Sequence, residues 1–304
     1  MILFFLSIPV IGAQEIPTPY VVVLGIAQDG GYPQAGCTKA CCSIAWKDPV
    51  CRRHVSCLAI IDPQSKQRWL IDATPDFKIQ LHNLDQIFPL DTSPGLAGIF
   101  ITHGHIGHYA GLVHLGREVM GAHRIPLYVM PRMAEFIRQN GPWDLLVQLK
   151  NIRIAELRNE QIVQLNQRIS ILPVQVPHRG EYTETVGYKI EGPQRKILYL
   201  PDIDKWSQWD EAVEDYIRAA DIAYLDATFF ADGEIPGRNM ADIPHPFITE
   251  SMDQFSKLPA EEKKKIRFIH FNHTNPVLNP ESEARKTILQ NGFRIAEEGE
   301  IEKL

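Results

Sequence analysis

Hydrophobic positions occur along the chain in short runs that are separated by Gly, Pro and polar residues. Short apolar runs of this kind, bounded by turn residues, are typical of buried strands. These runs are closely spaced in the middle of the chain. In the last part they alternate with segments whose apolar residues have helical spacing. The strand-like runs lie at residues 19–28, 56–62, 68–73, 95–102, 125–130, 152–157, 161–165, 169–178, 185–192, 196–202, 222–228 and 265–272.

Apolar residues at helical spacing predict a second set of segments. These lie at residues 76–84, 108–121, 131–140, 143–150, 209–221, 246–258 and 280–292. Strands dominate both halves, and helices intervene mainly after residue 108 and near the C-terminus. This order favours an α/β fold with two sheets whose outer faces are covered by helices.

Composition and charge narrow the possible partners. The chain has 304 residues, of which 44% are hydrophobic and 22% charged, as in ordinary globular proteins. The net charge of −6 gives no electrostatic reason to expect nucleic acid as a partner. No internal apolar run is long enough for a membrane span. We therefore expect a small-molecule substrate, and the oligomeric state stays open.

The N-terminus differs from the rest. An apolar stretch at residues 2–11 is followed by small residues before Gln14, which indicates a signal peptide over residues 1–13. No Lys or Arg precedes this stretch, so a cytoplasmic chain with a wrongly assigned start is the alternative. We expect an exported protein, periplasmic or secreted, in which residues 14–304 form a single domain.

A histidine-rich loop follows the strand predicted at residues 95–102. His103, His105 and His108 lie within "ITHGHIGHYAGL". Residues that alternate at a strand end point to the same side, and three imidazole nitrogens suit Zn²⁺. The alternative is that these histidines cap a helix or lie on a polar surface.

Further metal donors stand at or near the ends of other predicted strands. His178, Asp202 and His270 each occupy such a position. A lone Asp after a strand is usually a turn residue, but several donor-bearing strand ends in one chain favour a metal centre.

These residues give the chain a resemblance to the metallo-β-lactamase-fold superfamily. That family carries His-x-His-x-Asp-His followed by an isolated His, a bridging Asp and a last His. The resemblance implies a four-layer αββα sandwich and two metal positions that share Asp202. The ligands it implies are His103, His105 and His178 for the first metal, and His108 and His270 for the second. Asp72, in "WLIDA", resembles the family's orienting carboxylate, which is not a ligand.

The resemblance can be narrowed by the stretches "GYPQAGC", "DATPDFKIQL", "LDATFF" and "FIHFNHTNPVLN". Together they resemble the family of coenzyme PQQ synthesis protein B. The cysteine loop and "HFNH" also resemble the branch of phosphodiesterases that act on cyclic phosphates. The latter implies a structural zinc site made of Cys37, Cys41, Cys42 and His273. Cys41 and Cys42 are adjacent, so Cys51 could replace one of them, and free thiols or one disulfide are the alternative.

Gly107 stands where the superfamily has its second-metal aspartate. Because glycine has no side chain, we expect a strong first site and a weakened second one. On this interpretation Gly107→Asp should raise the occupancy of the second metal.

The chemistry implied is hydrolysis by a metal-activated water. Asp202 would orient the nucleophile and accept its proton. His245 would protonate the leaving group with support from Asp226, as the resemblance implies. The alternative is that His245 only caps a helix or lies in a turn beside two prolines.

We therefore expect a metallo-hydrolase acting on a phosphodiester or related ester, with one or two catalytic zinc ions. Iron or manganese are alternatives, since histidine and carboxylate donors also suit them. Two other functions remain open. One is an oxidative or accessory factor like PQQ synthesis protein B, with iron in the same ligands. The other is a non-catalytic binding protein on this fold.

Overall fold

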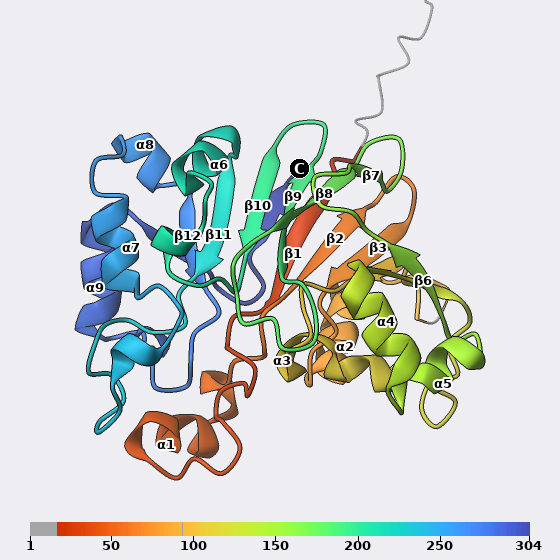
Figure 1. Ribbon diagram of the computed structural model, residues 1–304, viewed down its shortest axis with the longest axis horizontal. Coiled ribbons are helices and arrows are strands. Elements are labelled where there is room, and N and C mark those ends of the chain that lie inside the picture. The colour runs from red at the N-terminus through yellow and green to blue at the C-terminus, as the bar shows by residue number, and fades with distance from the viewer. Residues whose placement is uncertain (1–16, 93) are drawn as a thin grey trace, which may run out of the picture.

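The computed structural model describes residues 17–92 and 94–304. The signal peptide predicted over residues 1–13 lies outside these ranges. Two sheets, each of seven strands, face one another (Figure 1). In the order of their hydrogen-bonded neighbours, the strands of the first sheet are β14 (Ile301–Lys303), β1 (Tyr20–Gly25), β2 (Cys57–Asp62), β3 (Gln67–Ile71), β4 (Gly98–Phe100), β5 (Ile125–Val129) and β6 (Ile152–Glu156).

The second sheet has the mirrored arrangement, with its parallel strands at the other side of the molecule. Its strands in order are β13 (Arg294–Ile295), β12 (Ile266–Ile269), β11 (Ile222–Asp226), β10 (Lys196–Leu200), β9 (Val186–Glu191), β8 (Ser170–Gln175) and β7 (Val163–Gln164). In each sheet a run of parallel strands continues into antiparallel ones: β3 to β6 are parallel, as are β10 to β13.

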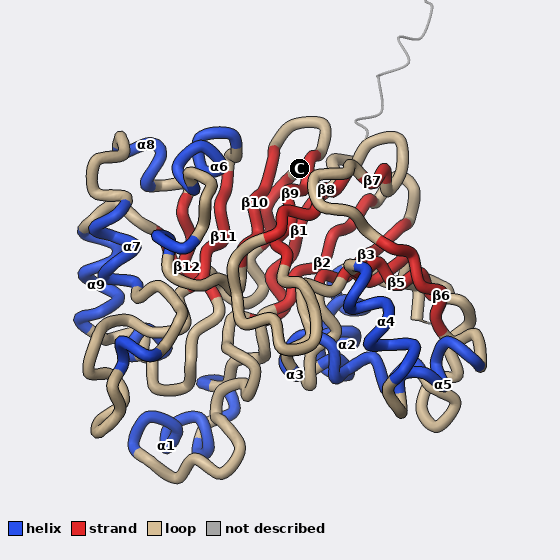
Figure 2. Tube along the Cα trace, in the orientation of Figure 1, coloured by secondary structure: helices blue, strands red, loops and turns tan. Residues whose placement is uncertain are grey.

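Helices cover the outer faces of both sheets, as the tube view shows most clearly (Figure 2). Those beside the first sheet include α2, α4 and α5, and those beside the second include α6, α7 and α9. The α-helices are α1 (Ala40–Lys47), α2 (Phe77–Ile87), α3 (Ile106–Tyr109), α4 (Pro131–Gln139), α5 (Trp143–Gln148), α6 (Val213–Ala219), α7 (Ile248–Gln254), α8 (Ala260–Lys263) and α9 (Glu283–Gln290). The architecture is the four-layer αββα sandwich that the sequence predicts.

The period of two along the central strands explains the layers. In β1, Val21 and Val23 belong to the core between the sheets, whereas Val22 and Leu24 belong to the core beneath the helices. Both sets are almost completely buried. Strands buried on both faces read as continuous apolar runs, which is why the sequence shows little alternation here.

One predicted helix is much shorter than expected. The apolar spacing predicts a single helix over residues 108–121, but α3 gives way to a 3₁₀ helix at Ala110–Leu115. Gly111 packs so closely against the preceding strand end that a Cβ there would lie 2.1 Å from the carbonyl oxygen of Thr74. This close approach requires glycine. Apolar spacing predicted the buried face of the segment but not its tight winding.

Parallel strands place their carboxyl ends at one edge of each sheet, and both edges lie at the same end of the sandwich. The residues that follow β3, β4, β10, β11 and β12 therefore meet there. Among the described helices, none has the length and apolar character needed to cross a membrane.

Candidate metal centre

Four donors form a first group at this common edge: His103, His105, His178 and Asp202. One donor atom from each lies within 4.8 Å of every other. Nε2 of His103 is 2.9 Å from Nδ1 of His105, and Nε2 of His178 is 3.4 Å from the same atom. The carboxylate of Asp202 lies 3.2 Å from His103 and 3.3 Å from His178. The structure thus brings together all the residues expected at the first position.

Hydrogen bonds on the far side of each ring fix which nitrogen faces the group. Nδ1 of His178 donates to Asp204 at 2.9 Å, and Nε2 of His105 donates to Glu181 at 3.2 Å. Nδ1 of His103 donates to the hydroxyl of Thr102 at 3.0 Å, and that hydroxyl in turn donates to the carboxylate of Asp72. In these tautomers the other ring nitrogen carries a lone pair, so three lone pairs converge.

A second group contains His108, His270 and Asp29. Nδ1 of His108 donates directly to Asp72 at 2.7 Å. Nδ1 of His270 donates to Thr228 at 3.0 Å, and this hydroxyl donates to Asp226. Both histidines therefore turn Nε2 toward Asp29, and neither Nε2 has a hydrogen-bond partner among the described residues.

Asp202 connects the two groups. Its carboxylate lies 3.8 Å from Nε2 of His108, and it also forms a close cluster with Asp226 and His270. The carboxylate therefore occupies the shared position that the sequence resemblance implies. It is buried, with only 3% of the residue exposed.

Asp29 was not expected, and it corrects the interpretation of Gly107. The expectation that the second group lacks a carboxylate of its own is wrong, because Asp29 from the loop after β1 supplies one. Oδ1 of Asp29 lies 3.4 Å from Nε2 of His108. A Cβ built on Gly107 would lie 2.5 Å from the Cα of Asp29, so Gly107→Asp would displace Asp29 and not add a ligand.

The sequence did carry a signal for Asp29. It follows the buried strand β1 within "IAQDGG", as Asp202 follows β10. The criterion that identified the other donors, an acidic or imidazole side chain just after an apolar strand, applies equally to Asp29. Gly30 and Gly31, which follow it, give the segment the sequence pattern of an ordinary turn.

The backbone holds two of these residues in an uncommon conformation. Asp72 and His270 have φ of +71° and +72°, in the left-handed region that residues other than glycine rarely adopt. Each comes directly after a parallel strand, where this turn directs its side chain into the centre. Such strain is typical of functional sites.

Burial and neighbouring charges shift the pKa values of these groups in opposite directions. Burial and the charge of His108 hold the pKa of His103 well below its usual value, which favours the neutral imidazole that a metal needs. Burial alone would lower the pKa of His108, but Asp72 and Asp29 outweigh it and raise that pKa well above its usual value. Opposing its burial, the charges of His178 and His245 hold the pKa of Asp202 low. The centre therefore favours a positive charge between its carboxylates.

His245 lies beside the centre and is buried. Its Nδ1 donates to Asp226 at 2.8 Å and lies 3.1 Å from Asp202. His245 does not cap a helix, since the N-cap of α7 is Phe247. It does lie at a bend between two prolines, as the other alternative has it. Burial lowers the pKa of His245, but the charges of Asp226 and Asp202 more than offset this and raise it to about 10.

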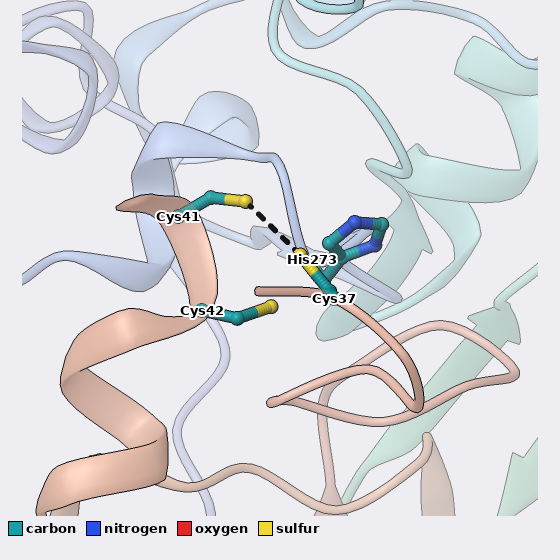
Figure 3. A group of neighbouring side chains, drawn as sticks. All are labelled: Cys37, Cys41, Cys42 and His273. Carbon is teal, nitrogen blue, oxygen red and sulfur yellow. Dashed lines mark hydrogen bonds between the residues drawn. The ribbon is translucent and has the colours of Figure 1, made fainter. Parts of the chain in front are cut away.

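A separate group of donors lies at the start of α1 and contains Cys37, Cys41, Cys42 and His273. Figure 3 shows the three sulfur atoms and the imidazole arranged around a common centre. Sγ of Cys37 is 3.7 Å from Sγ of Cys41, which is too far for a disulfide bond. All five cysteines are free thiols, and Cys51 is not part of this group.

The distances within the first group fit a metal ion. Two ligands that each lie about 2.0–2.1 Å from a tetrahedral zinc are separated by about 3.3–3.4 Å. The separations between His105, His178, His103 and Asp202 range from 2.9 to 3.4 Å for the pairs described above. Converging lone pairs repel one another unless a cation or proton lies between them. These residues therefore form a potential metal-binding cluster.

Comparison with known proteins agrees with this description. Residues 67–298 match the family described as "Beta-lactamase superfamily domain". The chain is 27% identical over 308 residues to "Coenzyme PQQ synthesis protein B" of Methylorubrum extorquens (strain PA1), which covers 92% of this chain and 98% of the relative.

Two solved structures share the fold over nearly the full length of both chains. The first is "Zn(2+)-bound PqqB from Methylobacterium extorquens", with a TM-score of 0.79, 24% identity, and coverage of 94% of this chain and 100% of that one. The second is "a New Diphosphatase from the PhnP Family", with a TM-score of 0.66, 24% identity, and coverage of 95% and 98%. Taken with the family match and the four-layer fold, these similarities show that the chain belongs to the metallo-β-lactamase superfamily.

Proposed function

We propose that this chain is a metal-dependent hydrolase that acts on a phosphodiester or a related ester. One observation carries the proposal. Two groups of donors lie on either side of Asp202, and His245, a potential proton donor, lies 3.1 Å from that same carboxylate. Proton donor and proton acceptor thus stand together at a cluster suited to divalent cations.

The role of the ion would be to polarise the ester and make a water nucleophilic at neutral pH. The remaining steps fall to side chains of the chain. Asp202 would orient the attacking water and accept its proton, since its oxygen atoms face both donor groups. His245 would donate a proton to the leaving group, and Asp226 would hold its ring in place through the 2.8 Å hydrogen bond.

We propose zinc as the metal of the centre, with one or two ions. Imidazole and carboxylate donors also accept iron and manganese, which remain the alternatives. The related structure from Methylobacterium extorquens is zinc-bound, which supports this choice. The group of Cys37, Cys41, Cys42 and His273 would hold one further zinc in a closed, structural site.

A phosphodiester is preferred over other esters for a geometric reason. Two cations side by side can bind the attacking and leaving oxygens of an in-line displacement at phosphorus. The two donor groups with a common carboxylate are arranged for such a pair. The fold shared with a diphosphatase of the PhnP family is consistent with this choice.

The second proposed function is an oxidative or accessory role, with iron in the same ligands. It is favoured by similarity to coenzyme PQQ synthesis protein B over 98% of the relative's length. The third is a non-catalytic binding protein, which the absence of a carboxylate at Gly107 would favour. Because Asp29 supplies a carboxylate to the second group, Gly107 no longer supports it.

The decisive experiment begins with elemental analysis of the full chain purified without added metal. The protein is then assayed against chromogenic phosphodiesters, lactones and β-lactams. Turnover of bis(p-nitrophenyl) phosphate that is lost in His103→Ala supports the proposal. A protein that is loaded with metal but inert across the panel overturns it. Tightly bound iron together with oxygen consumption favours the oxidative role.

We also propose that the chain is exported and that its mature form begins near Gln14. Expression of the full chain in a bacterial host, followed by N-terminal sequencing of the periplasmic fraction, tests this. An unprocessed chain confined to the cytoplasm overturns it.

A further inference from the structure

We propose that Asp29 is a ligand of the second metal, and that it replaces, from a different loop, a carboxylate next to His108. The residue follows β1, far in sequence from the histidine loop. Its Oδ1 nevertheless lies 3.4 Å from Nε2 of His108, and its donor atom is within 4.8 Å of those of His108 and His270. The inference rests on the proposed function only to the extent that the centre binds metal.

The buried polar atoms of this group point to a ligand. Oδ1 of Asp29, Nε2 of His108 and Nε2 of His270 are all buried, and none has a hydrogen-bond partner within the described part of the chain. His108 and His270 are completely buried. Buried polar atoms almost always form hydrogen bonds, so three such atoms that face one another without a hydrogen bond indicate a cation as their common partner.

Asp29 occupies the space that a side chain at position 107 would need. A Cβ on Gly107 would lie 2.1 Å from Oδ1 and 2.5 Å from Cα of Asp29. The second conflict involves backbone, so a rotation of the Asp29 side chain cannot relieve it. The glycine is therefore the complement of Asp29, because it lets the loop after β1 approach the histidine loop.

Backbone contacts hold Asp29 in this position. The amide of Gln28 donates to the carbonyl of Phe271 at 2.9 Å, and the amide of Phe271 donates to the carbonyl of Ile26 at 2.8 Å. These bonds attach the loop to the segment that carries His270. The two hydrogen-bonded segments thereby fix Asp29 and His270 relative to each other.

The donor set defines the class of cation. With Asp29, the second group has two imidazoles, one carboxylate of its own and the shared Asp202. This mixture suits zinc, manganese or ferrous iron and not magnesium, which prefers oxygen ligands. Asp29, from the loop after β1, thus supplies the negative charge that an aspartate at position 107 would have given.

The test uses the full chain and measures bound zinc, not activity. Wild type, Asp29→Asn and Gly107→Ala are dialysed against zinc buffered by a chelator, and bound zinc is measured by mass spectrometry of the metal and by calorimetric titration. Both variants should lose one equivalent per chain, or bind it at least about 10-fold more weakly. The ion of the first group should remain. Asp232→Asn changes an exposed carboxylate that belongs to none of the donor groups; it is the control and should match wild type.

Three results would overturn the inference. The first is Asp29→Asn that keeps both ions at unchanged affinity. The second is Gly107→Ala or Gly107→Asp that binds the second ion more tightly than wild type. The third is a wild-type chain in which no second ion binds at this group. Circular dichroism establishes that each variant is folded. If Asp29→Asn does not fold, Gly107→Ala, which retains the Asp29 side chain, still tests the inference. A wild-type protein that binds both ions, loses one in Asp29→Asn, yet hydrolyses nothing would sustain this inference and refute the proposed function.

Discussion

The carboxylate of Asp72 accepts a 2.7 Å hydrogen bond from Nδ1 of His108, and both side chains are completely buried. The same carboxylate accepts a hydrogen bond from Thr102, whose hydroxyl in turn accepts one from His103. Asp72 therefore orients one histidine of each donor group. On the other sheet, Asp226 holds His245 directly and His270 through Thr228.

Asp72→Asn should weaken metal binding by about 10–100-fold, the usual effect of losing a carboxylate behind a ligating histidine. Asparagine tolerates the left-handed backbone at this position, so the fold should persist. Zinc affinity measured by competition with a chelator checks the prediction. Asp62→Asn removes another buried carboxylate, one paired with Arg168, and should lower the melting temperature without changing zinc affinity. Equal zinc affinities for Asp72→Asn and wild type would contradict this role.

His103→Ala should remove the ion of the first group, because two nitrogens and Asp202 remain where three nitrogens converge. The expected result is one fewer zinc per chain and loss of hydrolytic activity. His82, exposed on α2, offers the control, and His82→Ala should keep the full zinc content. Full zinc content in His103→Ala would show that the first group is not a metal site.

Chelation of the metal should destabilise the folded chain. Binding of an ion at 100 times its dissociation constant stabilises a protein by about 2.7 kcal/mol, so dialysis against EDTA should lower the melting temperature by a few degrees. Differential scanning calorimetry with and without zinc measures the difference. A variant lacking His103, His108 and the cysteine ligand Cys37 should show no response to zinc, and a response as large as that of wild type would count against the proposed ligands.

The pH dependence of turnover should report on His245. A general acid must be protonated, so turnover should be present below the pKa of His245, which its carboxylate neighbours raise to about 10, and should fall as the pH rises through it. Asp226→Asn removes one of these carboxylates and should therefore move the alkaline limb to lower pH. The measurement is the pH profile of kcat, with His245→Gln as the variant that lacks the donor. An alkaline limb that stays in place in Asp226→Asn would argue against this pairing.

The cysteine group gives a prediction that connects two sites. Cys37 lies on the loop that carries Asp29, and His273 follows His270 after β12. Cys37→Ser should therefore remove the structural zinc and also weaken the second metal of the centre. Cys51→Ser is the control, since that thiol lies outside the group. A disulfide detected by mass spectrometry between Cys37 and Cys41 would contradict the zinc assignment.

Most of the fold and much of the centre could be predicted because each donor stands at the end of an apolar run. The positions of His103, His178, Asp202 and His270 relative to strands were enough to expect them at one edge. The cysteine and histidine group was expected only from family resemblance, and the spacing of Cys41 and Cys42 left its members open. The structure resolves this, because both lie in the first turn of α1 beside Cys37.

The position of Asp29 after a buried strand can be read from the sequence, but its relation to Gly107 cannot, because that depends on a contact between segments distant in sequence. Local sequence shows a Gly-rich turn after β1, and local sequence around Gly107 shows a missing carboxylate. Only the contact between the two loops shows that Asp29 brings a carboxylate to the place where Gly107 lacks one. The pairing of β1 with β14 is likewise set by packing, since a strand as short as Ile301–Lys303 has no distinctive pattern.

The donors of the centre come from both halves of the sandwich: His103 and His108 follow a strand of the first sheet, whereas His178, Asp202 and His270 follow strands of the second. A bound ion thus joins chain segments that are far apart in sequence, as a crosslink does. Closing such long loops limits the freedom of the unfolded chain, so metal and fold stabilise one another. The chain would acquire its full rigidity only when metal is supplied, and its lifetime in the cell would follow the local availability of that ion.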